Sequence, residues 1–101
     1  MSNQASKEMQ QRPSTGVERV EFVILAENHV DVLVRVVVLF HRLNVEIEGL
    51  YLVRRSGSLT MRLRVTVRAE REYASRMEAQ LYKLVQVRSV ETRTEPEDGA
   101  N

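Results

Sequence analysis

The sequence predicts an α+β domain in which two helices cover one face of a four-stranded antiparallel sheet. Its length of 101 residues supports one domain with a modest core. Its central part repeats one order twice: an apolar run, an amphipathic stretch, and a run that alternates apolar with polar residues. Two strand–helix–strand units with right-handed crossovers form a split βαβ sandwich, which leaves the other face of the sheet uncovered.

The first unit opens with a strand at 20–26. Alternation gives it an inward apolar face, made of Val20, Phe22, Ile24 and Ala26. Its outward face carries Glu21, Val23 and Leu25. Polar residues 27–31 end the strand, and Asn28 or Asp31 can cap a following helix through a side-chain oxygen.

Residues 32–43 carry two conflicting patterns. Valines at every second position from Val30 to Val38 favour a strand, because β-branched residues disfavour helix. The length of the segment, a stripe at helical spacing and the clear helix in the second unit favour a helix. We predict a helix. Its inward stripe would consist of Leu33, Val36, Val37, Phe40 and Leu43.

Residues 45–53 and 59–67 predict a hairpin, in which Gly57 supplies the positive φ of the turn. A register with Arg55 opposite Leu59 makes every inward pair apolar or glycine. These inward pairs would be Val53–Met61, Tyr51–Leu63, Gly49–Val65 and Ile47–Val67. The outward pairs would be Leu52–Arg62, Leu50–Arg64, Glu48–Thr66 and Glu46–Arg68.

The second unit continues with a helix at 70–84 and a strand at 85–91. The buried stripe of this helix would be Tyr73, Met77, Leu81 and Leu84. Polar residues dominate 1–16 and 94–101, so we expect disordered arms on either side of a domain at 17–93.

Composition argues against several classes of protein. The net charge is +1, from 15 Lys and Arg against 14 Asp and Glu, and there is no Cys. No apolar run approaches the roughly 20 residues of a membrane span, and residues 1–11 lack the apolar centre of a signal peptide. We therefore expect a cytoplasmic protein without a membrane partner.

Candidate catalytic and metal-binding residues are few. His29 and His41 are twelve residues apart in the chain and have no third ligand near them, so we expect surface residues rather than metal ligands or a base. Glu46 and Glu48 alternate on the outward face, where a charge ladder opposite Arg68 explains them. We predict no catalytic residue and no metal site.

The uncovered face of the sheet is the candidate docking surface. It would expose an apolar patch with arginines at its border, a combination typical of protein interfaces. The predicted docking residues are Val23, Leu25, Leu50, Leu52, Arg62 and Arg64. The same topology also serves RNA-recognition domains, which stack bases on aromatic residues, but the third strand has none on this face. We therefore expect no nucleic-acid partner, with nonspecific phosphate contact as the remaining basis for one.

Residues 20–93 resemble the ferredoxin-like ACT domain, and among its members most closely the regulatory small subunit of acetolactate synthase in its short form. The resemblance rests on Glu27-Asn28, on Leu33 with Arg35 and Val36, on Leu39-Phe40, on residues 45–50, on residues 61–67, and on Glu78. Its most specific part is the run Gln80-Leu81 and Lys83-Leu84-Val85 with Val87.

The resemblance implies a noncatalytic subunit in branched-chain amino acid biosynthesis. Such a subunit docks on and activates a large subunit, which would hold the thiamine diphosphate, Mg and FAD, so that this chain holds no cofactor. The resemblance also implies a homodimer paired through the second strands. The predicted edge is Val45, Glu46, Ile47, Glu48 and Gly49. In many members a branched-chain amino acid binds at this interface against the loop after the first strand.

Carried onto this sequence, the effector site would comprise Asn28, His29, Val30, Asp31, Val32, Leu33 and Glu46. Asn28 and Leu33 match the family's loop Asn and helix Leu, but Asp31 replaces a Gly and Glu46 replaces an Asn. Two carboxylates about 4 Å apart repel by roughly 1–4 kcal/mol in a partly screened site. We predict that docking is kept while binding of the amino acid is weakened or lost. The alternative is a stand-alone ACT module that senses another ligand or serves dimerisation.

Overall fold

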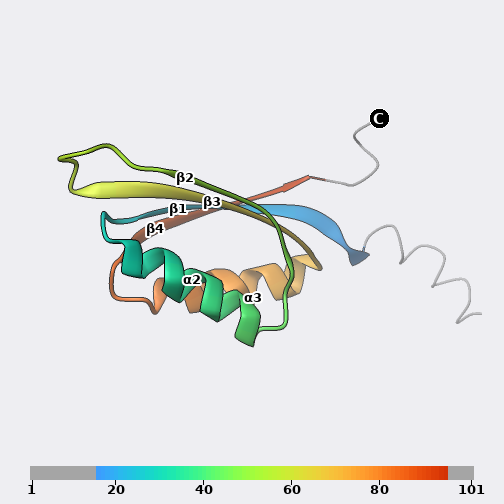
Figure 1. Cartoon of the computed structure of the whole chain (residues 1–101). Coiled ribbons are helices and arrows are strands. Elements are labelled where there is room, and N and C mark those ends of the chain that lie inside the picture. The colour runs from blue at the N-terminus through green and yellow to red at the C-terminus, as the bar shows by residue number, and fades with distance from the viewer. Residues whose placement is uncertain (1–15, 96–101) are drawn as a thin grey trace, which may run out of the picture.

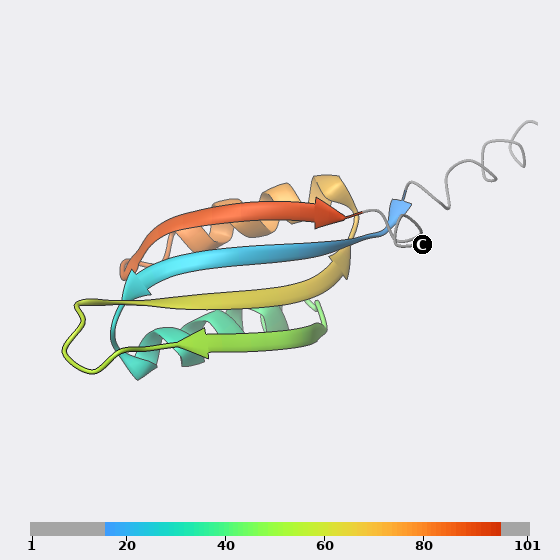
Figure 2. The ribbon, with the colours of Figure 1, turned by 90° about the horizontal axis from the view of Figure 1, so that it is seen from above.

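The computed structural model of the chain describes residues 16–95 and shows a sheet covered on one face by two helices (Figure 1). The elements are β1 (Glu18–Glu27), α2 (Val30–Arg42), β2 (Ile47–Val53), β3 (Thr60–Ala69), α3 (Arg71–Tyr82) and β4 (Val87–Glu95). The strands form an antiparallel sheet in the order β2-β3-β1-β4, so that β2 and β4 are its edges. The predicted fold is confirmed. The view from above places α2 on the β2 side of the molecule and α3 on the β4 side (Figure 2).

The valine-rich segment forms the helix α2, as predicted, but its buried face differs from the predicted stripe. The helix turns the face centred on Val36 toward the sheet, and its buried residues are Val32, Val36, Leu39 and Phe40. Val37, predicted to be inward, is 37% exposed. Burial against the sheet outweighs the weak helix propensity of valine, which costs only about 0.5 kcal/mol per residue relative to alanine.

The two ends of α2 are capped differently. The N-cap residue is His29, and no side chain caps it, so the predicted capping by Asn28 or Asp31 is wrong. Asp31 lies in the first turn, where its negative charge interacts favourably with the positive end of the helix dipole. At the other end Asn44 adopts φ 61°, and the N–H of the next residue donates to the carbonyl of Phe40 over 3.0 Å. This left-handed turn is a Schellman motif, which redirects the chain toward β2.

The core lies between the sheet and the helices, and β1 provides its centre. Val20, Phe22, Ile24 and Ala26 are fully buried, as predicted. The ring of Phe22 meets the ring of Phe40 edge to face at 5.7 Å between centroids. Helix α3 adds Ala74, Met77 and Leu81, with Tyr73 and Leu84 half-buried beside them. The Tyr73 hydroxyl donates to the Leu43 carbonyl over 2.7 Å, which ties the two helices together.

The hairpin register is correct at its far end and wrong near its turn. Ile47 pairs with Val67 as predicted, but an irregularity between Ile47 and Gly49 shifts the rest of β2 by one residue. The observed pairs are Gly49–Thr66, Leu50–Val65, Tyr51–Arg64, Leu52–Leu63 and Val53–Arg62. Because the side-chain period of a strand is two, the shift exchanges the faces of all four residues after Gly49. Gly57 has φ 83°, as the turn requires.

The limits of the domain differ slightly from the predicted ones. Strand β4 continues through Glu95, with Thr94 paired to Val20, so the tail predicted from Thr94 begins at least two residues later. The predicted arms otherwise lie outside the described residues, apart from Gly16. Within residues 16–95, neither helix is long and apolar enough to cross a bilayer.

Candidate docking and regulatory surfaces

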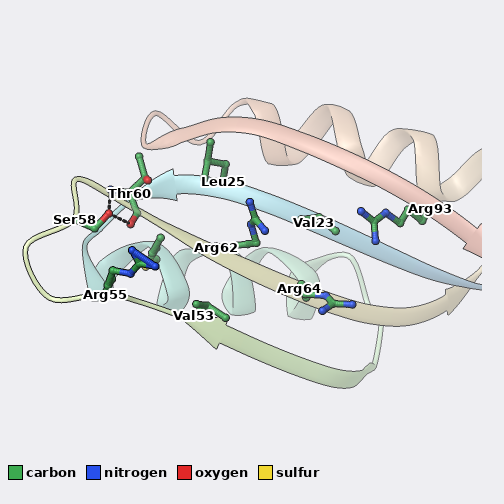
Figure 3. Close-up of a pocket in the computed structure, with 10 residues that line it drawn as sticks. Val23, Leu25, Val53, Arg55, Ser58, Thr60, Arg62, Arg64 and Arg93 are labelled. Carbon is green, nitrogen blue, oxygen red and sulfur yellow. Dashed lines mark hydrogen bonds between the residues drawn. The ribbon is translucent and has the colours of Figure 1, made fainter.

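The open face of the sheet, on the side away from the helices, carries two mixed rows of side chains near the hairpin. In the first row Arg62 on β3 lies between Leu25 on β1 and Val53 on β2. In the second row Arg64 lies between Val23 and Tyr51. A shallow pocket of about 440 Å³ opens over these rows and is bordered by Arg55, Ser58, Thr60 and Arg93 (Figure 3). The face therefore combines an apolar floor with guanidinium groups.

The arginines of this open face differ in how they are neutralised. Arg64 lies 3.0 Å from Glu21, and Arg93 lies 3.5 Å from the same carboxylate. Arg93 also donates to Glu91 over 3.2 Å, and this hydrogen bond, with the charges of Glu91 and Glu21, raises the pKa of the guanidinium. Within residues 16–95, Arg62 makes no ion pair and no side-chain hydrogen bond. Arg62 is thus the uncompensated charge at the centre of the face.

Four of the predicted docking residues lie on this open face, and two do not. Val23, Leu25, Arg62 and Arg64 are there. Leu50 and Leu52 are not, because the register shift between Ile47 and Gly49 turns them to the helical face. There Leu52 packs against the core and Leu50 is 43% exposed.

On the open face, Tyr51 and Val53 occupy the positions predicted for Leu50 and Leu52, and they are 61% and 48% exposed. They were predicted to be inward. The signal for this change is Gly49, since a glycine inside a strand often marks a bulge.

The loop after β1 is tied to the β2–β3 hairpin through Asn28. Its amide nitrogen donates to the Ser58 carbonyl over 2.9 Å, and its amide oxygen accepts from Arg54 over 2.7 Å. The Asn28 backbone N–H donates to the Leu59 carbonyl over 3.0 Å. The side chain proposed to face an effector is therefore engaged within the chain itself.

The other residues of the predicted effector site are dispersed. Val32 is fully buried and Leu33 is half-buried against the core, while His29, Val30 and Asp31 are exposed. Glu46 follows the C-terminal end of α2, whereas the loop precedes its N-terminal end. At 1.5 Å per residue the 13 residues of α2 span about 20 Å, so one chain does not bring Glu46 to the loop.

The predicted dimer edge is the free side of β2. Ile47, Glu48 and Gly49 belong to the strand, while Val45 and Glu46 precede it. Glu48 forms an ion pair with Arg68 at 2.8 Å, in the place that the predicted register gave to Glu46. Because β2 is an edge strand, the backbone groups on its free side are open to another strand.

A stripe of exposed valines runs along α2, on the side of the helix away from its buried residues. Its members, Val30, Val34, Val37 and Val38, are between 37% and 56% exposed. They recur at helical spacing, so they share one face. In a single chain these residues reduce helix propensity without gaining burial, which is typical of a surface that a partner covers. We call this set the α2 valine stripe.

The described part of the chain offers no cluster of side chains suited to a metal ion. Among residues 16–95 no charged or polar residue is buried, and no group of three or more His, Asp or Glu could hold a metal ion. His29 and His41 are exposed, as predicted.

The fold and these surfaces define a regulatory binding domain, and comparison with known families identifies its type. Residues 22–89 match the family model described as the AHAS small subunit-like ACT domain, AHAS being acetohydroxyacid synthase, another name for acetolactate synthase. The match spans well over half of the chain, and the chain belongs to this family. The predicted resemblance is thereby confirmed, and the chain contains an ACT-type regulatory domain. No curated protein matches the chain.

Solved structures show the same fold at low sequence identity. The ACT domain of GTP pyrophosphokinase from Chlorobium tepidum is 12% identical, with a TM-score of 0.65 over 76% of this chain and 99% of that one. The C-terminal domain of MgtC from Mycobacterium tuberculosis is 13% identical, with a TM-score of 0.64 over 85% and 96%. The regulatory subunit of aspartate kinase from Thermus thermophilus is 15% identical, with a TM-score of 0.56 over 82% and 56%.

Replacing Asn28 with alanine is expected to lower the free energy of unfolding by about 1–2 kcal/mol, because the Ser58 carbonyl loses its donor and only the backbone bond to Leu59 still ties the loop to the hairpin. Urea denaturation at a fixed protein concentration measures the change. Arg54→Ala is the control, because it removes only an exposed hydrogen bond and should cost less than about 1 kcal/mol. Equal losses in the two variants would show that the contact with Ser58 contributes nothing.

Proposed function

We propose that this protein is the noncatalytic regulatory small subunit of acetolactate synthase, acting in branched-chain amino acid biosynthesis in the cytoplasm. It docks on the large subunit and activates it. The observation that carries the proposal is the match of residues 22–89 to the AHAS small subunit-like ACT domain. The open face supports it with exposed apolar side chains and a central unpaired arginine. Thiamine diphosphate, Mg and FAD belong to the large subunit in this proposal, and catalysis takes place there.

The proposal includes a homodimer paired along β2, as ACT domains commonly dimerise. The free edge of β2 supplies backbone donors and acceptors to the same strand of a second copy. Because α2 is the helix on the β2 side, this pairing brings the two α2 helices side by side, and part of the α2 valine stripe would then lie against the partner's helix. One isologous interface thus explains the free edge and the exposed valines.

In such a dimer the effector residues gather in a way that one chain does not allow. The β2 strand runs from the C-terminal end of α2 toward the hairpin, where Asn28 lies. Antiparallel pairing of two copies would bring Glu46 of one copy toward the loop of the other. The site would then hold the carboxylates of Asp31 and Glu46, which repel the carboxylate of a free amino acid. Asn28 is already occupied by Ser58 and Arg54.

We therefore expect isothermal titration of the purified protein with valine, leucine or isoleucine to give no binding heat at millimolar ligand. Asp31→Gly is the matched variant, since it removes the added carboxylate and restores the residue of the family pattern. A gain of binding in this variant would support electrostatic loss of the effector. Micromolar binding to the unaltered protein would contradict it.

The function is tested by purifying the affinity-tagged full-length chain from its source organism. A small subunit should carry with it a large enzyme that contains thiamine diphosphate. Recovery of the protein as a homodimer with no such enzyme would favour the alternative, a stand-alone ACT module for ligand sensing or dimerisation. In this alternative the protein would also pair along the β2 edge, but its open face would have no defined partner.

A further inference from the structure

The open face holds one arginine that is placed as an anchor for a partner. Arg62 lies in the middle of the sheet, next to Leu25 on one side and Val53 on the other in the strand register. Figure 3 shows these three side chains together above β3 and its neighbours. Arginines with apolar surroundings and no internal counterion are frequent hot spots, because a partner that covers them excludes water from the new ion pair.

The surroundings of Arg62 determine the sign and the kind of group it can accept. Its neighbour Arg64 is already paired with Glu21, and Arg93 is shared between Glu21 and Glu91. Arg55 stands at the border of the same pocket, and within residues 16–95 it too makes no ion pair. The hairpin end of the face therefore has an excess of positive charge, and a carboxylate complements it.

The apolar part of the face determines the rest of the ligand. Val23 and Leu25 lie on one side of Arg62 and Arg64, and Tyr51 and Val53 lie on the other. A fully hydrated anion would leave these apolar side chains uncovered. Tyr51, a single exposed aromatic residue on the edge strand of this face, does not provide the row of aromatic rings on which single-stranded nucleic acid stacks its bases. The surface thus fits a peptide segment with apolar side chains around an acidic one.

We infer that the open face binds an acidic, apolar segment of the large subunit's polypeptide, in which one Asp or Glu forms an ion pair with Arg62 while neighbouring apolar side chains cover Leu25, Val53 and Tyr51. The inference rests on the proposed function and specifies its docking surface. It distinguishes this surface from the β2 edge, which serves a second copy of the same chain.

The test measures the affinity of the full-length protein for the purified large subunit from the same organism. Arg62→Glu should weaken binding at least about 30-fold, because it places two carboxylates opposite each other in a covered site. Arg62→Lys keeps the positive charge but lacks the planar guanidinium group, and it should weaken binding by less than about tenfold. The matched control is Arg76→Glu on the exposed surface of α3, which should change binding by less than about threefold. Sedimentation should show the same oligomer for all variants.

A photoreactive amino acid in place of Leu25, which lies next to Arg62 on the inner strand β1 and away from the β2 edge, identifies the bound segment by mass spectrometry. A cross-linked large-subunit peptide with Asp or Glu among apolar residues supports the inference. A cross-link to a peptide without a carboxylate contradicts it, and so does a cross-link to a second copy of this chain. Competition by single-stranded RNA that is lost in Arg62→Glu would assign the arginine to phosphates and overturn the inference.

The proposed function and the inference fail in different ways. Unchanged binding of Arg62→Glu to the large subunit would overturn the inference and leave the proposed function standing. Failure of the unaltered protein to bind the large subunit would overturn both.

Discussion

Replacing Phe40 with alanine is expected to lower the free energy of unfolding by about 3–5 kcal/mol. The Phe40 side chain is fully buried, and its ring meets that of Phe22 at 5.7 Å. This contact joins α2 to the central strand β1, so its removal leaves a cavity between the two layers. A domain of this size has a total stability of about 5–15 kcal/mol, of which the loss is a large share.

Urea denaturation measures the effect, at one protein concentration because the proposed dimerisation would add to the apparent stability. Phe40→Leu is the matched variant. It retains most of the apolar volume and should cost less than about 1.5 kcal/mol. If Phe40→Ala destabilised the protein by less than about 1 kcal/mol, the Phe22–Phe40 contact would not be the centre of the core.

Placing glutamate at both Val34 and Val38 is expected to abolish self-association. These residues are 56% and 43% exposed in the single chain, so the substitutions should change the stability of the monomer by only about 0.5 kcal/mol. In the proposed dimer the two α2 helices would lie side by side, and four carboxylates would have to be desolvated next to one another. We expect the dissociation constant of the dimer to rise at least about 100-fold, equivalent to about 3 kcal/mol.

Sedimentation velocity over a range of concentrations measures this change. The matched control is Val85→Glu, in the turn after α3, where the native side chain is 90% exposed. It introduces one glutamate in place of an exposed valine outside the proposed interface and should leave association unchanged. A dimer that persists in the Val34→Glu, Val38→Glu variant would show that α2 lies outside the interface and that β2 pairing, if present, does not bring the helices together.

The fold could be predicted from the sequence because its two units agree with each other. The alternating valines of residues 30–38 favour a strand by local propensity, and comparison with the second unit resolved that conflict. The buried face of α2 was harder to predict, since apolar residues surround most of the helix. When Val34, Val37 and Val38 are as apolar as Val32 and Val36, periodicity alone cannot separate a core face from an interface.

The register of β2 could not be predicted from alternation for a similar reason. Residues 50–53 are all apolar, so either set of faces gives an apolar interior. Only the irregularity between Ile47 and Gly49 determines that Tyr51 and Val53, rather than Leu50 and Leu52, lie on the open face. The tie between Asn28 and Ser58 was also beyond the sequence, because it joins residues 30 positions apart through a loop.

The most direct test of the proposed role is the turnover of the purified acetolactate synthase large subunit from the same organism, with and without this protein. Titration of the full-length chain should raise turnover to a plateau at a fixed ratio of the two subunits, and added valine should leave the stimulated rate unchanged. Turnover that stays at its basal value throughout the titration would contradict the assignment of this chain as a subunit of the synthase.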